Sequence, residues 1–257
     1  MEIHPTAMVD DSATIGEGAV IGPYAVIGPH CQIGDDCRID HHANVGAFTT
    51  IDAGGRLWPM CSVGTEPQDL KFGGEDSRLV IGRNVMVREF VTINRGTHHG
   101  GGVTRIGDDC MFMAYSHVAH DCQLGDQVIM ANAATLAGHV TIEDHVNLGG
   151  LVDVHQFTRI GRYCFVGGLS GVSNDLPPFC LCEGNRAKTH GLNVVGLKRA
   201  GFGPEVLEAL KQAYKIVFRT RTPLARALEQ VEGEVADLTE VRHFVDFIRG
   251  SERGVAR

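Results

Sequence analysis

Histidine is the residue type whose placement in this chain points most directly to chemistry. Four of the 13 histidines fall close together, at His117, His120, His139 and His155, and Asp121 directly follows one of them. An imidazole whose second nitrogen is held by a carboxylate is suited to taking a proton from a substrate hydroxyl, which contributes roughly 10² to 10⁴ in rate. We therefore expect general-base chemistry in this part of the chain.

Two other interpretations of these histidines stay open at this point. Three imidazoles on neighbouring elements are enough ligands for a zinc ion, as in a zinc carbonic anhydrase, but the spacing His117-x-x-His120 does not match the ligand spacing expected of such an enzyme, so we predict no metal. The histidines of a non-catalytic scaffold would simply be solvated. Their number, and the glycine-rich segment that precedes them, favour a catalytic site.

The elements that position these histidines follow a period of six residues. From Val9 to Val63 every sixth residue is aliphatic, and the spacing returns from Ile81 to Ile93 and, in a shifted frame with apolar residues, from Ile106 to Val172. A period of six is neither helical nor a simple alternation, and the glycine that often follows the apolar residue marks a turn. The pattern predicts short strands joined by tight turns.

A second set of positions, four residues after the first, holds small or β-branched residues. Six of the 8 cysteines fall there, which indicates small buried side chains rather than redox chemistry or a metal site. Ser116 and Cys122 also occupy such inward positions. We therefore expect no serine or cysteine nucleophile, and a direct transfer without a covalent enzyme intermediate.

Three strand-and-turn units close a triangle, so the repeat predicts a prism built from coils of 18 residues. Parallel ladder hydrogen bonds stack such coils about 4.8 Å apart. Each residue then lies above the one 18 positions earlier, which brings several polar side chains to one side of the prism. These are His120, Asp121, Gly138, His139, His155 and Gln156.

The pattern divides the chain into two domains. Residues 1–191 form the predicted parallel β-helix, which is interrupted by polar, glycine-rich loops at 64–78 and 94–105. Insertions of this kind tend to build the binding face of a solenoid. In residues 192–257 apolar residues recur at helical spacing, which predicts an α-helical C-terminal subdomain. The fold class is therefore mainly β.

Composition excludes several classes of protein. The formal net charge is −8, which gives no overall attraction for nucleic acid. The N-terminus lacks the basic and apolar regions of a signal peptide, and no stretch approaches the roughly 20 apolar residues that span a bilayer. We expect a cytoplasmic protein with no integral membrane segment.

Several longer motifs carry a more specific resemblance. These are EPQDLKFGGE, VTINRGTHHGGG, SHVAHDC, ANAATLAGHV, VHQF and GLNVVGLKRAGF. On these motifs, which extend from the first loop to the C-terminal part, the chain resembles the UDP-N-acetylglucosamine O-acyltransferases of the hexapeptide-repeat family. The resemblance implies a left-handed coil. It also implies transfer of an (R)-3-hydroxyacyl group from acyl carrier protein to the sugar 3-hydroxyl, the first step of lipid A biosynthesis in Gram-negative bacteria.

The resemblance also implies roles for individual residues. His120 would be the general base, Asp121 would orient it, and the Gly138 N–H would stabilise the oxyanion. Gly168 matches the position that limits acyl-chain length. The expected sugar, phosphate, nucleotide and pantetheine contacts are Asp69, Lys71, His117, His139, His155, Gln156, Asn193 and Arg199.

The family further implies a homotrimer with its site between adjacent prisms, and a thioester donor in place of any cofactor. This chain departs from the family pattern at Asn94, Val195 and Ala200. Two related enzymes are alternatives, namely the later N-acyltransferase of the same pathway and a coenzyme A-dependent acetyltransferase. The N-acyltransferase usually has an extra N-terminal domain, whereas the repeat begins at once here.

Overall fold

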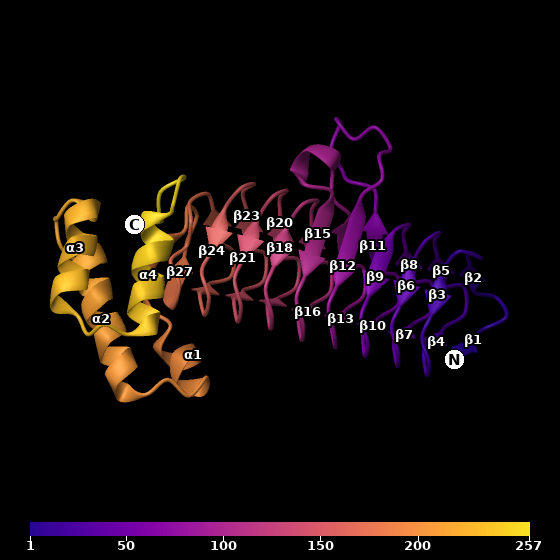
Figure 1. The fold of residues 1–257 in the computed structure, drawn as a ribbon, viewed down its shortest axis with the longest axis horizontal. Helices are drawn as coiled ribbons and strands as arrows, with labels where there is room; N and C mark the ends of the chain where they lie inside the picture. The colour runs from indigo at the N-terminus through magenta and orange to yellow at the C-terminus, as the bar shows by residue number, and fades with distance from the viewer.

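The main body of the protein is a triangular prism whose three sides are parallel β-sheets, here called sheets A, B and C (Figure 1). The computed structural model describes residues 1–257. The chain passes from sheet A to sheet B to sheet C and returns to sheet A one coil later, so that Ile21 pairs with Ile39 and Ile27 with Val45. This is the left-handed parallel β-helix, and the predicted fold class is confirmed.

Sheet A has 11 strands and runs the whole length of the prism. Its strands are β1 (Glu2–Ile3), β4 (Val20–Ile21), β7 (Arg38–Ile39), β10 (Arg56–Leu57), β13 (Met86–Val87), β16 (Met111–Phe112), β19 (Ile129–Met130), β22 (Asn147–Leu148), β25 (Phe165–Val166), β27 (Cys180–Glu183) and β28 (Lys188–Leu192).

Sheets B and C have nine and eight strands. Sheet B contains β2 (Met8–Val9), β5 (Val26–Ile27), β8 (Asn44–Val45), β11 (Ser62–Thr65), β14 (Thr92–Asn94), β17 (His117–Val118), β20 (Thr135–Leu136), β23 (Asp153–Val154) and β26 (Gly171–Val172). Sheet C contains β3 (Thr14–Ile15), β6 (Gln32–Ile33), β9 (Thr49–Ile51), β12 (Arg78–Ile81), β15 (Val103–Ile106), β18 (Gln123–Leu124), β21 (Thr141–Ile142) and β24 (Arg159–Ile160).

The period of six arises from one strand and one tight turn. The second residue of most strands points inward and is buried, as Ile21, Ile27 and Ile39 are. Turns along the prism place one residue in the left-handed backbone region, where an L side chain points outward, for example Tyr24 at φ 57°. All eight cysteines are buried and unpaired, which confirms the prediction that the six in the repeat are small core residues.

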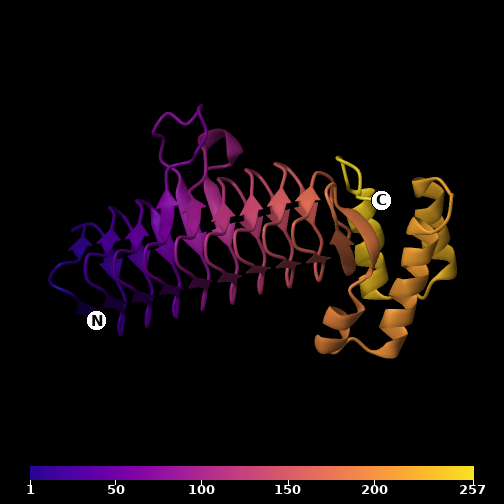
Figure 2. The same cartoon turned by 180° about the vertical axis from the view of Figure 1, so that it is seen from behind.

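Two loops leave the prism at the edge between sheets B and C, here called the B–C edge. Residues 66–77 connect β11 to β12, and residues 95–102 connect β14 to β15 and include the short 3₁₀ helix η1 (His98–Gly100). Both loops rise on the same side of the prism (Figures 1 and 2). The second loop is shorter than the sequence predicts, because Val103 to Arg105 pair with β12.

The C-terminal part packs on the last coils (Figure 2). After the antiparallel pair β27 and β28 come α1 (Val194–Arg199), α2 (Pro204–Phe218), α3 (Leu224–Glu234) and α4 (Thr239–Arg249). His243 of α4 reaches the prism, where its Nε2 lies 2.7 Å from the Glu143 carboxylate. None of the helices combines the length and the apolar character that crossing a membrane requires.

Candidate active site

The B–C edge carries a column of side chains that the coil repeat stacks on one another. Asp121, His139 and Phe157 occupy the left-handed position of successive turns, with φ of 60°, 62° and 61°. The His139 N–H donates to the His120 carbonyl at 3.0 Å, which fixes the vertical register. The column therefore places an imidazole directly above a carboxylate.

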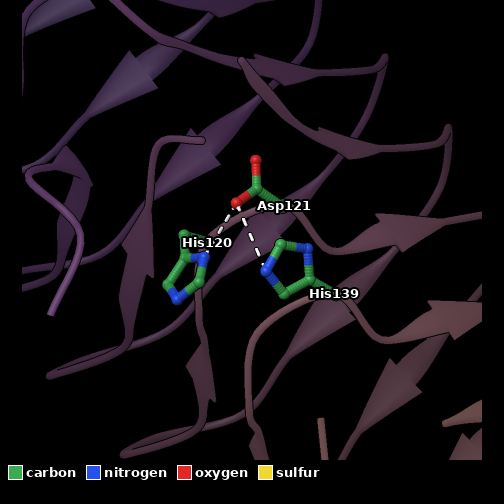
Figure 3. A group of neighbouring side chains, drawn as sticks. All are labelled: His120, Asp121 and His139. Atoms are coloured by element: carbon green, nitrogen blue, oxygen red, sulfur yellow. Dashed lines mark hydrogen bonds and ion pairs between the residues drawn. The ribbon is translucent and has the colours of Figure 1, made fainter. Parts of the chain in front are cut away.

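His120, Asp121 and His139 form the centre of this site (Figure 3). The His120 Nδ1 lies 2.8 Å from Asp121 Oδ2, and the His139 Nε2 lies 3.9 Å from the same oxygen. The Asp121 side chain is 0% exposed, whereas the two imidazoles are 14% and 18% exposed. A buried carboxylate thus holds one nitrogen of a ring that still reaches solvent.

The second loop fixes the Asp121 carboxylate from the other side. Thr97 donates to Oδ1 from its N–H at 2.9 Å and to Oδ2 from its hydroxyl at 2.6 Å. Gly100 lies so close that a Cβ there would meet the carboxylate carbon at 2.1 Å. Because the loop shields the carboxylate and satisfies it, Asp121 can orient His120 without competition from water.

Position 138 requires a glycine because a side chain there would clash with the His120 ring. A Cβ at Gly138 would lie 2.6 Å from the ring Cε1, and the backbone there needs no positive φ. The Gly138 N–H donates no hydrogen bond within the protein, and at the same place in earlier turns Pro23, Pro29 and Pro59 have no N–H at all. No backbone carbonyl of the coil accepts from this position, and no side chain accepts from Gly138, so its N–H is free for a ligand beside His120.

Asp69 on the first loop faces the same site. Its Oδ2 lies 3.2 Å from the His99 Nε2, and its Oδ1 accepts from the Lys71 N–H at 3.0 Å. The Lys71 N–H lowers the pKa of Asp69 most, and positive charge on His120 and His99 lowers it further. The two loops therefore meet over the imidazoles, with His99 facing His139 at 6.3 Å between ring centroids.

Burial shifts the pKa of two histidines of this region in the same direction. His117 lies on β17, where its Nδ1 is 2.7 Å from the Thr92 hydroxyl. Burial lowers the pKa of His117, although Thr92 opposes the shift. Burial also lowers the pKa of His139, against the raising effect of Asp121. Both rings therefore favour the neutral form.

Several other predicted residues form no hydrogen bond or ion pair with this centre, although His155 and Gln156 lie on the same edge one coil further along. His155 and Gln156 are exposed, and the His155 Nδ1 faces the Gln156 carbonyl at 3.0 Å and an Arg253 nitrogen at 3.2 Å. No hydrogen bond, ion pair or ring contact joins His155 to the centre formed by His120, Asp121 and His139. Gly168 lies on a different edge, between sheets A and B, with Gly150 as its neighbour.

Asn193 and Arg199 line a separate cavity of about 910 Å³ along the edge between sheets C and A. Asn193 caps α1, since its Oδ1 accepts from the Gly196 N–H at 3.0 Å, and its Nδ2 donates to the Tyr163 carbonyl. Within one chain, this cavity and the His120 centre lie on two different edges of the prism. The residues predicted for binding thus form two separate groups.

Sequence reasoning missed two residues of the site. His99 was part of the motif VTINRGTHHGGG but received no role, and the signal that marks it is a pair of histidines inside a glycine-rich loop. Thr97 was missed because its bond to Asp121 joins residues 24 positions apart, which does not match the coil period.

Comparisons with known proteins identify the family and agree with the fold. Sequence profiles match the hexapeptide transferase repeat at residues 12–47 and 104–138, and the second domain of UDP-N-acetylglucosamine O-acyltransferase at residues 175–256. An acyl-[acyl-carrier-protein]–UDP-N-acetylglucosamine O-acyltransferase from Anaeromyxobacter sp. (strain Fw109-5) is 55% identical over 257 residues and covers 100% of both chains. The chain belongs to the UDP-N-acetylglucosamine O-acyltransferase family.

Solved structures of this family share the whole fold. The UDP-N-acetylglucosamine O-acyltransferase from Moraxella catarrhalis RH4 is 40% identical, covers 100% of both chains and superimposes with a TM-score of 0.97. A structure from Acinetobacter baumannii is 38% identical, with the same coverage and TM-score. The resemblance read from the sequence motifs is confirmed, and so is the prediction of an acyltransferase.

Proposed function

We propose that this protein transfers an (R)-3-hydroxyacyl group from acyl carrier protein to the 3-hydroxyl of UDP-N-acetylglucosamine, as the first step of lipid A biosynthesis. The observation that supports this most is the His120 ring, whose Nδ1 is held by buried Asp121 at 2.8 Å. The bond fixes the tautomer with the proton on Nδ1, so that Nε2 is left as a proton acceptor.

The reaction then needs only groups already placed at the B–C edge. The His120 Nε2 takes the proton from the sugar 3-hydroxyl while the hydroxyl oxygen attacks the thioester carbonyl carbon. The Gly138 N–H donates to the oxyanion of the tetrahedral intermediate. When the intermediate collapses, the carbon–sulfur bond breaks and the imidazolium returns the proton to the leaving thiolate, while Asp121 stabilises the transient positive charge.

Substrate binding uses the loops that rise above this centre. Asp69 and His139 face the sugar, Lys71 pairs with a phosphate, and His117 and Gln156 complete the sugar and phosphate contacts. His155, Asn193 and Arg199 hold the nucleotide and pantetheine side. Gly168 leaves room for a long acyl chain because it has no side chain.

We also infer a homotrimer. The His120 centre and the cavity that contains Asn193 and Arg199 lie on different edges of one prism, so a single chain cannot bring them to one substrate. Adjacent prisms in a closed ring would set one edge of each against a different edge of the next. The acidic carrier protein would dock on a local basic set, since the net charge of −8 gives no general attraction. The donor thioester needs no further cofactor.

Mass spectrometry of the reaction product tests this function. The enzyme is incubated with UDP-N-acetylglucosamine and a series of 3-hydroxyacyl-carrier-protein donors. We expect an ester at the sugar 3-hydroxyl and no amide, with one chain length preferred. A product formed only from a 3-amino sugar, or only from acetyl coenzyme A, would contradict the proposal.

A further inference from the structure

The centre drawn in Figure 3 also has the composition of a metal site, although the histidine spacing in the sequence predicts none. His120, Asp121 and His139 each offer one ligand atom, and these atoms lie within 4.8 Å of one another. No other group of three histidine, cysteine, aspartate or glutamate side chains in the chain meets this condition. Two imidazoles and one carboxylate are a donor set that zinc and similar ions accept.

Two of the three distances between the ligand atoms lie close to those of a bound ion. Zinc binds nitrogen and oxygen at about 2.0 to 2.2 Å, which places tetrahedral ligands about 3.3 Å apart. The observed separations from Asp121 Oδ2 are 2.8 Å to the His120 Nδ1 and 3.9 Å to the His139 Nε2, so they bracket this value. The two imidazole nitrogens lie within 4.8 Å of each other, so the rings must approach by up to about 1.5 Å to complete the geometry.

The surroundings already hold the ligands in place. Thr97 fixes the carboxylate through two hydrogen bonds, and Phe157 of the next coil stacks on the His139 ring, with 4.4 Å between ring centroids and 6° between planes. Supporting contacts of this kind orient the ligands of metal sites. Because both rings remain partly exposed, an ion can enter and keep a water as its fourth ligand.

We propose that His120, Asp121 and His139 bind a divalent transition metal ion such as Zn²⁺, and that the bound ion inhibits the acyl transfer. The inhibition rests on the proposed function and follows from the tautomer of His120. An ion on Nδ1 takes the lone pair there and moves the ring proton to Nε2. The ring stays neutral, but Nε2 now carries a proton and cannot accept one from the sugar hydroxyl.

Metal binding is tested without substrate, on the full-length protein freed of metal by a chelator. Calorimetric titration with Zn²⁺ is expected to show one ion per chain, and Co²⁺ to give the intense visible absorption of a tetrahedral site without thiolate bands. His139→Ala removes one ligand and is expected to weaken binding at least tenfold. His41→Ala removes one of two exposed neighbouring imidazoles, whose Nδ1 atoms lie 3.0 Å apart, and should change nothing.

Equal affinity in wild type and His139→Ala, an affinity that His41→Ala lowers instead, or no binding at all would overturn the proposed site. Acyl transfer measured in parallel should fall in proportion to zinc occupancy and recover with chelator, and stimulation by zinc would overturn the inhibition. The two proposals fail separately. A metal-free enzyme without any acyl transfer contradicts the proposed function, while the calorimetric and cobalt results still decide the metal site.

Discussion

Two histidines on the B–C edge have the same backbone setting and different surroundings. His30 has φ 57° and stacks on Phe48 one coil away, at 5.1 Å between ring centroids. His139 has φ 62° and stacks on Phe157 in the same way, at 4.4 Å. His30 is exposed, however, and makes no ring contact with another histidine, whereas His139 lies beside buried Asp121 and edge-on to His120.

The difference comes from interruptions of the repeat and not from the repeat itself. Regular turns supply a ladder of outward side chains at any height of the prism. The loops at 66–77 and 95–102 lie between the two histidines along this edge. They bring the paired Asp69 and His99 to the upper histidine, and Thr97 to Asp121 beside it. The coil therefore positions the rings, and the inserted loops add the side chains that complete a site around one pair of turns.

The largest expected effect is on kcat, and it distinguishes the site at His120 from the regular coils that carry His30. His120→Ala removes the proposed base and should lower kcat by about 10² to 10⁴ while the fold is retained. His30→Ala, the matched change on the regular coils, should leave kcat at the wild-type value. Steady-state kinetics with circular dichroism measures both. Similar kcat values for the two variants would contradict a catalytic role that His120 has and His30 lacks.

A second prediction concerns Gly138, whose place in three earlier turns is taken by proline. Gly138→Ala puts a methyl group 2.6 Å from the His120 Cε1, so the ring must move. A displacement near 1 Å costs about 100-fold in rate, so kcat should fall by that order with the thermal midpoint little changed. Gly191→Ala, where a Cβ meets nothing within 4 Å, is the control. Wild-type kcat in Gly138→Ala would show that the His120 ring position is not critical.

The smallest expected effect is on the free energy of unfolding. It comes from the burial of the histidines of the site, whereas His30 is exposed. Because burial lowers the pKa of His117 below its ordinary value, the unfolded chain takes up a proton at a higher pH than the folded protein. The free energy of unfolding should therefore fall as the pH drops from about 6.5 towards the folded pKa, by at most about 1.4 kcal/mol per pH unit for this group. His117→Asn should reduce that slope. Urea unfolding between pH 7 and pH 5 measures it, and an unchanged slope contradicts the assignment.

Much of the fold follows from the sequence because each coil repeats a local rule. An inward aliphatic every six residues and a tight turn after it are enough to predict short strands, a triangular section and an 18-residue coil. The same counting predicts that Asp121 lies under His139, and the structure places them in successive turns. The predicted helical C-terminal segment is also helical in the structure, although a break at 235–238 divides its last part into α3 and α4.

Counting fails where the chain leaves the repeat. The contact between Thr97 and Asp121 and the pair formed by His99 and Asp69 join residues across loops, whose paths have no period. Counting also placed His155 with the other imidazoles, but the structure turns it towards Arg253 near the C-terminus.

The sequence alone therefore determined the prism and the height of each side chain along it, because parallel strands in register leave no other arrangement for a strict period. Only the tertiary structure decided which imidazoles share a carboxylate, which donor the coil leaves free, and which predicted residues lie on another edge. These depend on the paths of the loops and on side-chain directions. Both are set by contacts between residues far apart in the chain, which no local pattern records.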